Sequence, residues 1–219
     1  MSKLVIFGAG DIARLAHYYF TRDSEHEVVA FVVDKQYRNS DTFLGLPLLD
    51  FDEVSKKYPP ESHQMFIALS YAQMNKVRAE KYYKAKGLGY KLASYVSSKC
   101  SWLTDNPIGE NCFILEDNTI QPFVKIGNDV TLWSGNHIGH DVVIEDHSFI
   151  TSHVVVSGNV HICPYCFIGV NATLRNSITI APETLIGAGA IIMNDTVEKG
   201  VYVPKLAEIL SKESNEIKL

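Results

Sequence analysis

Three of the chain's eight histidines fall within one short segment, SGNHIGHDVVIEDHSF, at residues 134–149. Clustered imidazoles are typical of zinc sites, whereas a single imidazole beside a carboxylate is typical of a general base. Asp141 directly follows His140, and this pair fits the second kind of chemistry. The choice depends on which side chains the fold brings together.

A repeat of six residues runs through the second half of the chain. From Ile108 to Ile192, fifteen consecutive hexads carry Ile, Leu or Val at the same position without an insertion. Neither helical spacing nor strand alternation produces this period. It is typical of a hexapeptide β-helix, in which a short strand turns a corner every six residues. We expect three hexads per coil, about five coils, and residues eighteen apart in sequence stacked about 4.8 Å apart.

The register also assigns places to glycines and cysteines. Glycine often follows the inward residue, and we expect it where the chain bends sharply and a Cβ would be costly; the positions are Gly109, Gly127, Gly139, Gly169 and Gly187. Cys163 and Cys166 form a CPYC motif, which suits a redox pair only at a helix N-terminus. The hexads instead place Cys166 inward and Cys163 at a corner, which argues against redox chemistry.

Zinc binding is disfavoured by histidine spacing. The second half resembles the hexapeptide-helix carbonic anhydrases in fold, and these build a zinc site from histidines on adjacent coils and adjacent subunits, including a pair five residues apart. The second half offers no two histidines separated by five or by eighteen residues, so we predict no metal; they are His137, His140, His147, His153 and His161. We expect His147 on the surface at a corner and His153 stacked between Gly135 and Asn171. His137, which is adjacent to the inward Asn136, is a candidate to support a site.

His140 has the surroundings of a general base. It follows the corner glycine Gly139, so its side chain should point outward, where Asp141 can fix its tautomer. One coil further on stands Gly158, which we expect to leave space above the imidazole. Its backbone N–H could donate to a carbonyl oxygen that gains negative charge. A solvated surface histidine is the alternative.

The first hundred residues follow a different pattern. Apolar runs indicate strands at 3–8, 27–34, 65–70 and 90–96. Helical spacing indicates helices at 11–22, 51–58 and 71–87. Such alternation predicts a parallel sheet flanked by helices. We therefore expect an α/β half-Rossmann-like domain over 1–99, a parallel β-helix over 100–203, and a C-terminal cap helix over 204–219.

A glycine loop, GAGDIA at 8–13, follows the first strand and opens a helix. Gly8 and Gly10 would let the backbone approach a phosphate, and the helix N-terminus favours negative charge. Asp34 ends the second strand. A single βαβ half suits a mononucleotide or nucleotide-sugar, and a purely structural turn is the alternative. An NAD-dependent oxidoreductase, which the loop alone suggests, would leave the hexads unexplained.

Composition and net charge limit the kinds of partner expected for this protein. Hydrophobic residues make up 46% and charged residues 21% of the chain, as in ordinary globular proteins. The net charge of −5 argues against a nucleic acid as the main partner. The apolar opening is too short for a signal peptide, and no run approaches the roughly 20 apolar residues of a membrane span. We expect a cytoplasmic protein.

The whole chain resembles the nucleotide-sugar N-acetyltransferases of the left-handed hexapeptide β-helix type, including those for GDP-perosamine and UDP-linked 4-amino sugars, and the related sialic acid O-acetyltransferases. The motifs that carry the resemblance are FGAGDIA with FVVD, WSGNHIGHD, FITSHVVVSGNV, FIGVNATLRNS and IGAGAIIMND. It implies a homotrimer with active sites between subunits, acetyl-CoA in the groove between two β-helices, and a role in O-antigen or cell-surface glycan biosynthesis. The implied reaction is direct N-acetylation of a nucleotide-linked 4-amino-4,6-dideoxy sugar; O-acetylation of a sugar or sialic acid is the alternative.

The resemblance also assigns roles to residues. His140 matches the catalytic base, Asp141 its acidic companion, and Gly158 the glycine whose backbone binds the acetyl carbonyl. Substrate contacts are implied for Gly8, Gly10, Asp34, Trp133, Asn136 and His137. Cofactor contacts are implied for Ser157, Gly158, Phe149, Gly169 and Gly187. The chain departs from the family at Phe149, where some relatives carry a histidine. In place of the family's common terminal GNPAK it has VPKLAEI at 203–209, so contacts to the adenine end of the cofactor do not carry over.

Overall fold

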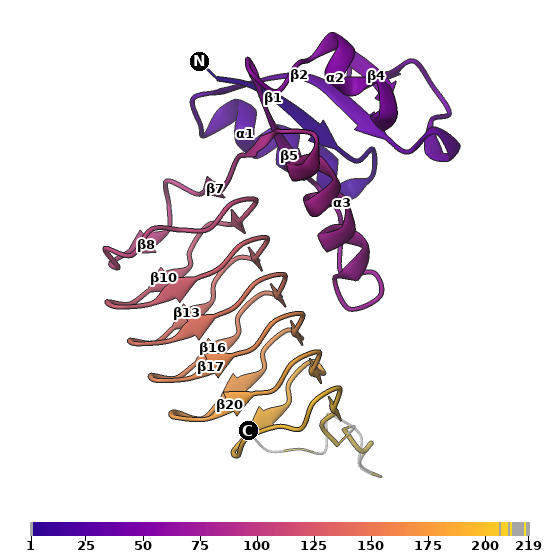
Figure 1. The fold of residues 1–219 in the computed structure, drawn as a ribbon. Helices are drawn as coiled ribbons and strands as arrows, with labels where there is room; N and C mark the ends of the chain where they lie inside the picture. The colour runs from indigo at the N-terminus through magenta and orange to yellow at the C-terminus, as the bar shows by residue number, and fades with distance from the viewer. Residues whose placement is uncertain (1, 206, 210, 212–216, 218–219) are drawn as a thin grey trace.

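The computed structural model describes residues 2–205, 207–209, 211 and 217. An α/β domain forms one end of the molecule, and a parallel β-helix extends from it toward the C-terminus (Figure 1). One helix of the α/β domain, α3 (Lys76–Gly87), runs alongside the first coils of the β-helix (Figure 1). The two periods of the sequence therefore correspond to two parts of one molecule.

The α/β domain is built on a six-stranded sheet in the order β3-β4-β2-β1-β5-β6, parallel except for the β3–β4 pair. Its strands are β1 (Ser2–Phe7), β2 (His26–Val33), β3 (Thr42–Phe43), β4 (Leu46–Asp50), β5 (His63–Ile67) and β6 (Lys91–Leu92). Its other helices are α1 (Asp11–Arg22), α2 (Val54–Lys57) and the 3₁₀ turns η1 (Lys35–Tyr37) and η2 (Phe51–Glu53). Strand β1 is apolar throughout its centre because both faces are covered: Leu4 and Val5 enter different core clusters.

The structure refines the expected elements. The strand expected over 90–96 is two strands: β6 pairs with the α/β sheet, whereas β7 (Tyr95–Val96) already pairs with the β-helix. The change of partner thus comes a few residues before the expected boundary at residue 99. The β3–β4 hairpin was not anticipated, because two residues are too short to show a period.

The β-helix is a prism with three parallel sheets, which the chain visits in rotation. Sheet I contains β7, β9 (Phe113–Ile114), β12 (Thr131–Leu132), β15 (Phe149–Ile150), β18 (Phe167–Ile168), β21 (Leu185–Ile186) and β23 (Val201–Tyr202). Sheet II contains β8 (Ser101–Trp102), β10 (Thr119–Ile120), β13 (His137–Ile138), β16 (Val155–Val156), β19 (Thr173–Leu174) and β22 (Ile191–Ile192). Sheet III contains β11 (Lys125–Ile126), β14 (Val143–Ile144), β17 (His161–Ile162) and β20 (Thr179–Ile180).

The hexad residues form the core of this prism, as predicted. They lie in a single apolar cluster, in which Ile120, Ile138 and Val156 are fully buried. Paired residues are eighteen apart, as in His137 against Val155. The stack extends beyond the expected five coils, because sheet I alone has seven strands. Cys166 is fully buried within the prism, as the register predicted.

The corners show that the role expected for the hexad glycines was partly wrong. The left-handed conformation recurs every six residues at non-glycine positions, including Asn111, Asp129, Asp141, His147 and Asn171. The corner glycines two residues earlier have ordinary φ values and do not make the bend. They are needed for close approach of backbones: a Cβ on Gly139 would lie 2.6 Å from the nitrogen of Gly158.

Buried polar groups join the α/β domain to sheet I and its corner with sheet III. Arg78 on α3 is 1% exposed and binds Asp129 through Nε, at 2.9 Å. Asn75 donates to the carbonyl of Cys166 at 3.1 Å, and Tyr71 packs against Phe149. Because Arg78, Asp129 and Asn75 are removed from water, their pairing fixes where α3 lies on the β-helix.

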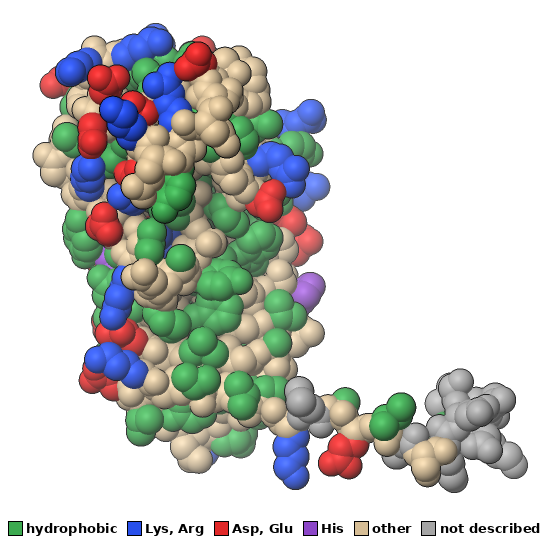
Figure 2. All heavy atoms as spheres, turned by 90° about the vertical axis from the view of Figure 1, so that its right-hand side faces the viewer, with side chains coloured by type: hydrophobic (Ala, Val, Ile, Leu, Met, Phe, Trp, Pro, Cys, Tyr) green, Lys and Arg blue, Asp and Glu red, His purple; other side chains and the backbone are tan. Residues whose placement is uncertain are grey.

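The surface differs between the two parts. In Figure 2, charged side chains gather over the α/β domain, and apolar ones are prominent over the β-helix. The cap helix expected over 204–219 falls largely outside the described residues, and the described residues of that segment are not assigned to a helix. No helix in the described part of the chain has the length and apolar character needed to cross a membrane.

Candidate active site

His140 lies at the corner between sheets II and III, in the turn that links β13 to β14. Its Nδ1 is 2.9 Å from Oδ2 of Asp141, and both side chains are about half exposed, at 56% and 49%. The backbone of His140 is held by Gln121, whose side-chain oxygen accepts its N–H at 2.9 Å. With Nδ1–H donating to the carboxylate, Nε2 carries the lone pair of a base.

Gly158 stacks against the His140 ring, as the spacing of eighteen predicts. A Cβ on Gly158 would lie 2.5 Å from Nε2, so the ring occupies the place of the missing side chain. The structure therefore corrects the expectation of open space above the imidazole. Within the described residues, the N–H of Gly158 makes no hydrogen bond, although its neighbours Ser157 and Asn159 donate to Leu174 and His140. An unpaired donor thus lies beside the base.

The glycine loop lines a cavity of about 500 Å³ at the carboxyl ends of β1 and β2. Gly8 has φ +125°, and a Cβ there would lie 2.7 Å from the carbonyl oxygen of Ala68, so glycine is required. Gly10 precedes helix α1 and has no atom within 4 Å of a Cβ position. Asp34 also lines the cavity. The three residues predicted for the nucleotide lie together.

Lys81 joins this cavity from α3, although no sequence motif marks it as a site residue. Its Nζ is 2.9 Å from Asp34, and its side chain is 11% exposed. Burial by itself would lower the pKa of Lys81, but hydrogen bonds to Asp34 and Glu80 outweigh burial and raise it. Lys81 is therefore a firmly cationic group, suited to a phosphate or to polar atoms of a base.

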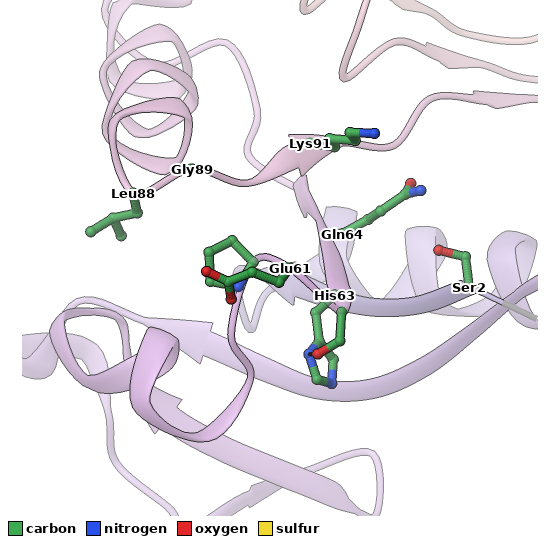
Figure 3. Close-up of a pocket in the computed structure, with 9 residues that line it drawn as sticks. Ser2, Glu61, His63, Gln64, Leu88, Gly89 and Lys91 are labelled. Carbon is green, nitrogen blue, oxygen red and sulfur yellow. Dashed lines mark hydrogen bonds between the residues drawn. The ribbon is translucent and has the colours of Figure 1, made fainter.

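A second cavity of about 500 Å³ lies at the opposite end of the same sheet (Figure 3). Ser2, His63 and Lys91, at or next to the amino ends of β1, β5 and β6, line it. The labelled side chains do not converge, since Leu88 points away from Gln64 and Lys91 (Figure 3). Ligands of open parallel sheets bind at the carboxyl ends of strands, which favours the cavity at Gly8.

Comparisons with known proteins agree with this geometry. Residues 108–140 and 123–158 match the family model "Bacterial transferase hexapeptide (six repeats)". Residues 108–158 of the β-helix therefore carry hexapeptide repeats similar to those of this family. The predicted repeat family and the fold, a left-handed β-helix after an α/β domain, are confirmed.

Three solved structures share the fold over nearly the whole chain. The acetyltransferase domain of PglB from Neisseria gonorrhoeae has a TM-score of 0.78 at 20% identity, covering 92% of this chain and 96% of its own. A variant of perosamine N-acetyltransferase from Caulobacter crescentus, in complex with CoA and GDP-perosamine, has 0.79 at 19%, covering 92% and 93%. WeeI from Acinetobacter baumannii has 0.79 at 21%, covering 96% and 100%.

The predicted cofactor residues lie at two different corners of the hexapeptide domain. Ser157 and Gly158 are at the corner of sheets II and III, beside His140. Gly169 and Gly187 are at the corner of sheets I and II. Sheet II, which carries His137 on its outer face, separates the two groups within one chain.

Two predicted site residues prove to be buried. Asn136 is 1% exposed, and its amide donates to the carbonyl of Trp133 while its oxygen accepts from Val154. It closes a turn inside the prism and has no free group for a substrate. Phe149 is 2% exposed under Tyr71, which is itself half exposed. Within the chain, neither residue therefore presents an accessible surface for the substrate or cofactor contact expected of it.

Trp133 and His147 take other positions. Trp133 packs against the α/β core, and its indole N–H is buried without a partner among the described residues. His147, expected at the surface, is 1% exposed and bonds Asp129 through Nδ1 at 2.8 Å. The spacing of eighteen would have found Asp129, since it stands one coil before His147.

Proposed function

We propose that the protein is an acetyl-CoA-dependent N-acetyltransferase that acts on the amino group of a nucleotide-linked amino-deoxy sugar. One observation carries the proposal: the Nε2 of His140 packs beside a glycine whose N–H has no partner in the described part of the chain, while Asp141 holds Nδ1. A base and an oxyanion donor are what transfer of an acyl group to an amine requires.

In this mechanism His140 accepts a proton from the sugar amine as the amine nitrogen attacks the thioester carbonyl carbon. Asp141 stabilises the imidazolium, and the N–H of Gly158 binds the carbonyl oxygen as it gains negative charge. When the carbon–sulfur bond breaks, His140 returns the proton to the departing thiolate. Neither a metal nor a covalent enzyme intermediate is needed, because positioning and proton transfer suffice.

The nucleotide is assigned to the cavity lined by Gly8, Gly10, Asp34 and Lys81. Its volume of about 500 Å³ lies in the range of small-molecule sites. Three features support a nucleotide diphosphate there: the close-approach glycines, the N-terminus of α1 and the cationic Lys81. The perosamine N-acetyltransferase with the same fold was solved with GDP-perosamine and CoA.

The assembly we propose is a homotrimer with active sites between subunits. The α/β domain docks on sheet I, whereas His140 lies at the far edge of sheet II. The cofactor residues are likewise divided between the two edges of sheet II. A second copy that brings its sheet I/II corner to this chain's His140 would complete the site. Exposed apolar residues on sheet II, Val155 at 40% and Ile191 at 68%, support such contact.

CoA is assigned to the edge that continues from His140. Two to three coils further along it, a shallow cavity of about 370 Å³ is lined by Arg175, Asn176 and Asn194. Arg175 supplies a cation there, and an exposed arginine is suited to contact the phosphates of the cofactor.

The decisive experiment incubates the protein with acetyl-CoA and a panel of UDP-, GDP- and dTDP-linked amino sugars while release of free thiol is followed. We expect activity on one nucleotide class and a product acetylated at nitrogen. Activity confined to sialic acid would assign O-acetylation instead. No release with any acceptor, combined with tight binding of NADH, would overturn the acetyltransferase. Light scattering during chromatography tests the trimer.

A further inference from the structure

A cluster of three different metal-binding groups lies outside the site described above. Glu145, His161 and Cys163 meet on sheet III near its corner with sheet I, and their ligand atoms all lie within 4.8 Å of one another. Nε2 of His161 is 2.5 Å from Oε1 of Glu145. The proposed reaction uses none of these groups.

The backbone holds the cluster on its most regular part. Glu145 and Cys163 occupy the same position on consecutive coils, just after β14 and β17, and their N–H groups donate to Ile162 and Ile180 at 2.8 and 2.9 Å. His161 belongs to β17 and pairs with Val143. Because the ladder fixes all three Cα positions, only side-chain rotation is needed to bring the ligand atoms around one ion.

The Cys163 thiol differs from the chain's other thiols. The Sγ atoms of Cys100, Cys112 and Cys166 each donate to a backbone carbonyl. Within the described residues Cys163 makes no such bond, although it lies beside an imidazole and a carboxylate. A metal ion would bind Sγ of Cys163 as a thiolate, with loss of the thiol proton to solvent.

We propose that Glu145, His161 and Cys163 bind a divalent transition-metal ion of the zinc type. Carboxylate, imidazole and thiolate are the three ligand classes of Zn²⁺ in proteins, and three protein ligands leave a fourth position for water. That position is open, because the side chains of His161 and Glu145 are 45% and 41% exposed. On the next coil the position of Cys163 is occupied by Ala181, which has no ligand atom, so the cluster does not continue along the β-helix.

The ion would link two consecutive coils and play no part in acyl transfer. His140 and Gly158 are at the other edge of sheet III, at its corner with sheet II. Sequence spacing missed the cluster, because a search restricted to pairs of histidines cannot find a site made of one histidine, one cysteine and one glutamate.

The test uses Co²⁺ as a spectroscopic probe on protein freed of metal by a chelator. We expect one Co²⁺ per chain, with a thiolate-to-cobalt charge-transfer band that Zn²⁺ displaces, and a rise in melting temperature on Zn²⁺ addition. Cys163→Ser should remove the band and weaken Zn²⁺ binding by at least about tenfold, since even outer-shell partners contribute that much. Cys100→Ser, the matched control, should keep both.

X-ray absorption of the zinc-loaded protein should show one sulfur at about 2.3 Å. The proposal is overturned if the protein binds no ion stoichiometrically, or if Cys163→Ser binds Co²⁺ with an unchanged spectrum. Thiol-release activity is measured in parallel: Cys163→Ser should retain it, so failure of the metal site and failure of the acetyltransferase are distinguished.

Discussion

Two histidines at neighbouring corners of the same coil each bond an aspartate, one next in sequence and the other one coil earlier. His140 meets Asp141 at 2.9 Å, and His147 meets Asp129 at 2.8 Å, each through Nδ1. The first pair is about half exposed, whereas the side chains of the second are 2% and 0% exposed.

The environment of Nε2 separates their roles. In His147 it lies 2.9 Å from the hydroxyl of Tyr83, and the ring stacks on Tyr165. In His140 it packs beside Gly158 at an open corner. A histidine with both nitrogens satisfied and no access to solvent joins α3 to the β-helix, and one with a free nitrogen is available for proton transfer. The length of the hydrogen bond between imidazole and carboxylate therefore does not by itself identify a general base.

The comparison is tested most strongly by His140→Ala. We expect turnover to fall by about 10²- to 10⁴-fold, the usual contribution of a general base. The melting temperature should stay the same, because the side chain is exposed and supports no buried group. Thiol release and thermal melting measure the two effects. His63→Ala, on the far side of the α/β sheet, is the control and should keep full turnover; a His140→Ala enzyme with wild-type turnover would refute the base.

Asp129→Asn should have the opposite profile. It removes the charge that faces Arg78, whose side chain is 2% exposed, and leaves a buried guanidinium without its counter-ion. We expect the free energy of unfolding to fall by about 3–5 kcal/mol, the usual cost of breaking a buried ion pair. Denaturant titration measures it. An Asp129→Asn protein of wild-type stability would show that the buried pair does not hold the two parts together.

Much of this arrangement could be predicted from sequence because the β-helix has a strict period. Once the hexads fix the register, the inward position of Cys166 and the stacking of His140 on Gly158 follow from counting. The glycine loop at Gly8 is equally predictable from the sequence, because its motif reflects a local requirement of the backbone.

The rest depends on packing between distant segments, which no local period encodes. The family resemblance implies a substrate contact for Asn136, but its amide is used inside the prism. Phe149 is covered by Tyr71, and Lys81 reaches Asp34 from α3; both contacts depend on where the α/β domain docks. The surface position expected for His147 is wrong because α3 docks over this corner, and the hexad pattern does not encode that docking.

Gly158→Ala tests the close packing of the base. The new Cβ would lie 2.5 Å from Nε2 of His140, so the ring must turn away, while the backbone conformation suits alanine. We expect at least a tenfold loss of turnover, since displacement of the base by about 1 Å is costly. Gly87→Ala, where a Cβ meets nothing within 4 Å, is the control and should leave turnover unchanged. Full activity of Gly158→Ala would place the reacting base elsewhere.

Asp141→Asn should have the smallest effect and defines how much the exposed carboxylate contributes. Asparagine tolerates the φ of 58° at this corner, so the fold should be kept and stability should change by no more than about 0.5 kcal/mol. Turnover should fall by about three- to tenfold, because water screens a half-exposed pair and also solvates the imidazolium. Asp117→Asn, at a corner with φ 60°, is the matched control and should change neither quantity. A loss of turnover in Asp141→Asn as large as that in His140→Ala would mean that the second copy covers this corner and removes the pair from water. The pair would then have the same buried environment as His147 and Asp129.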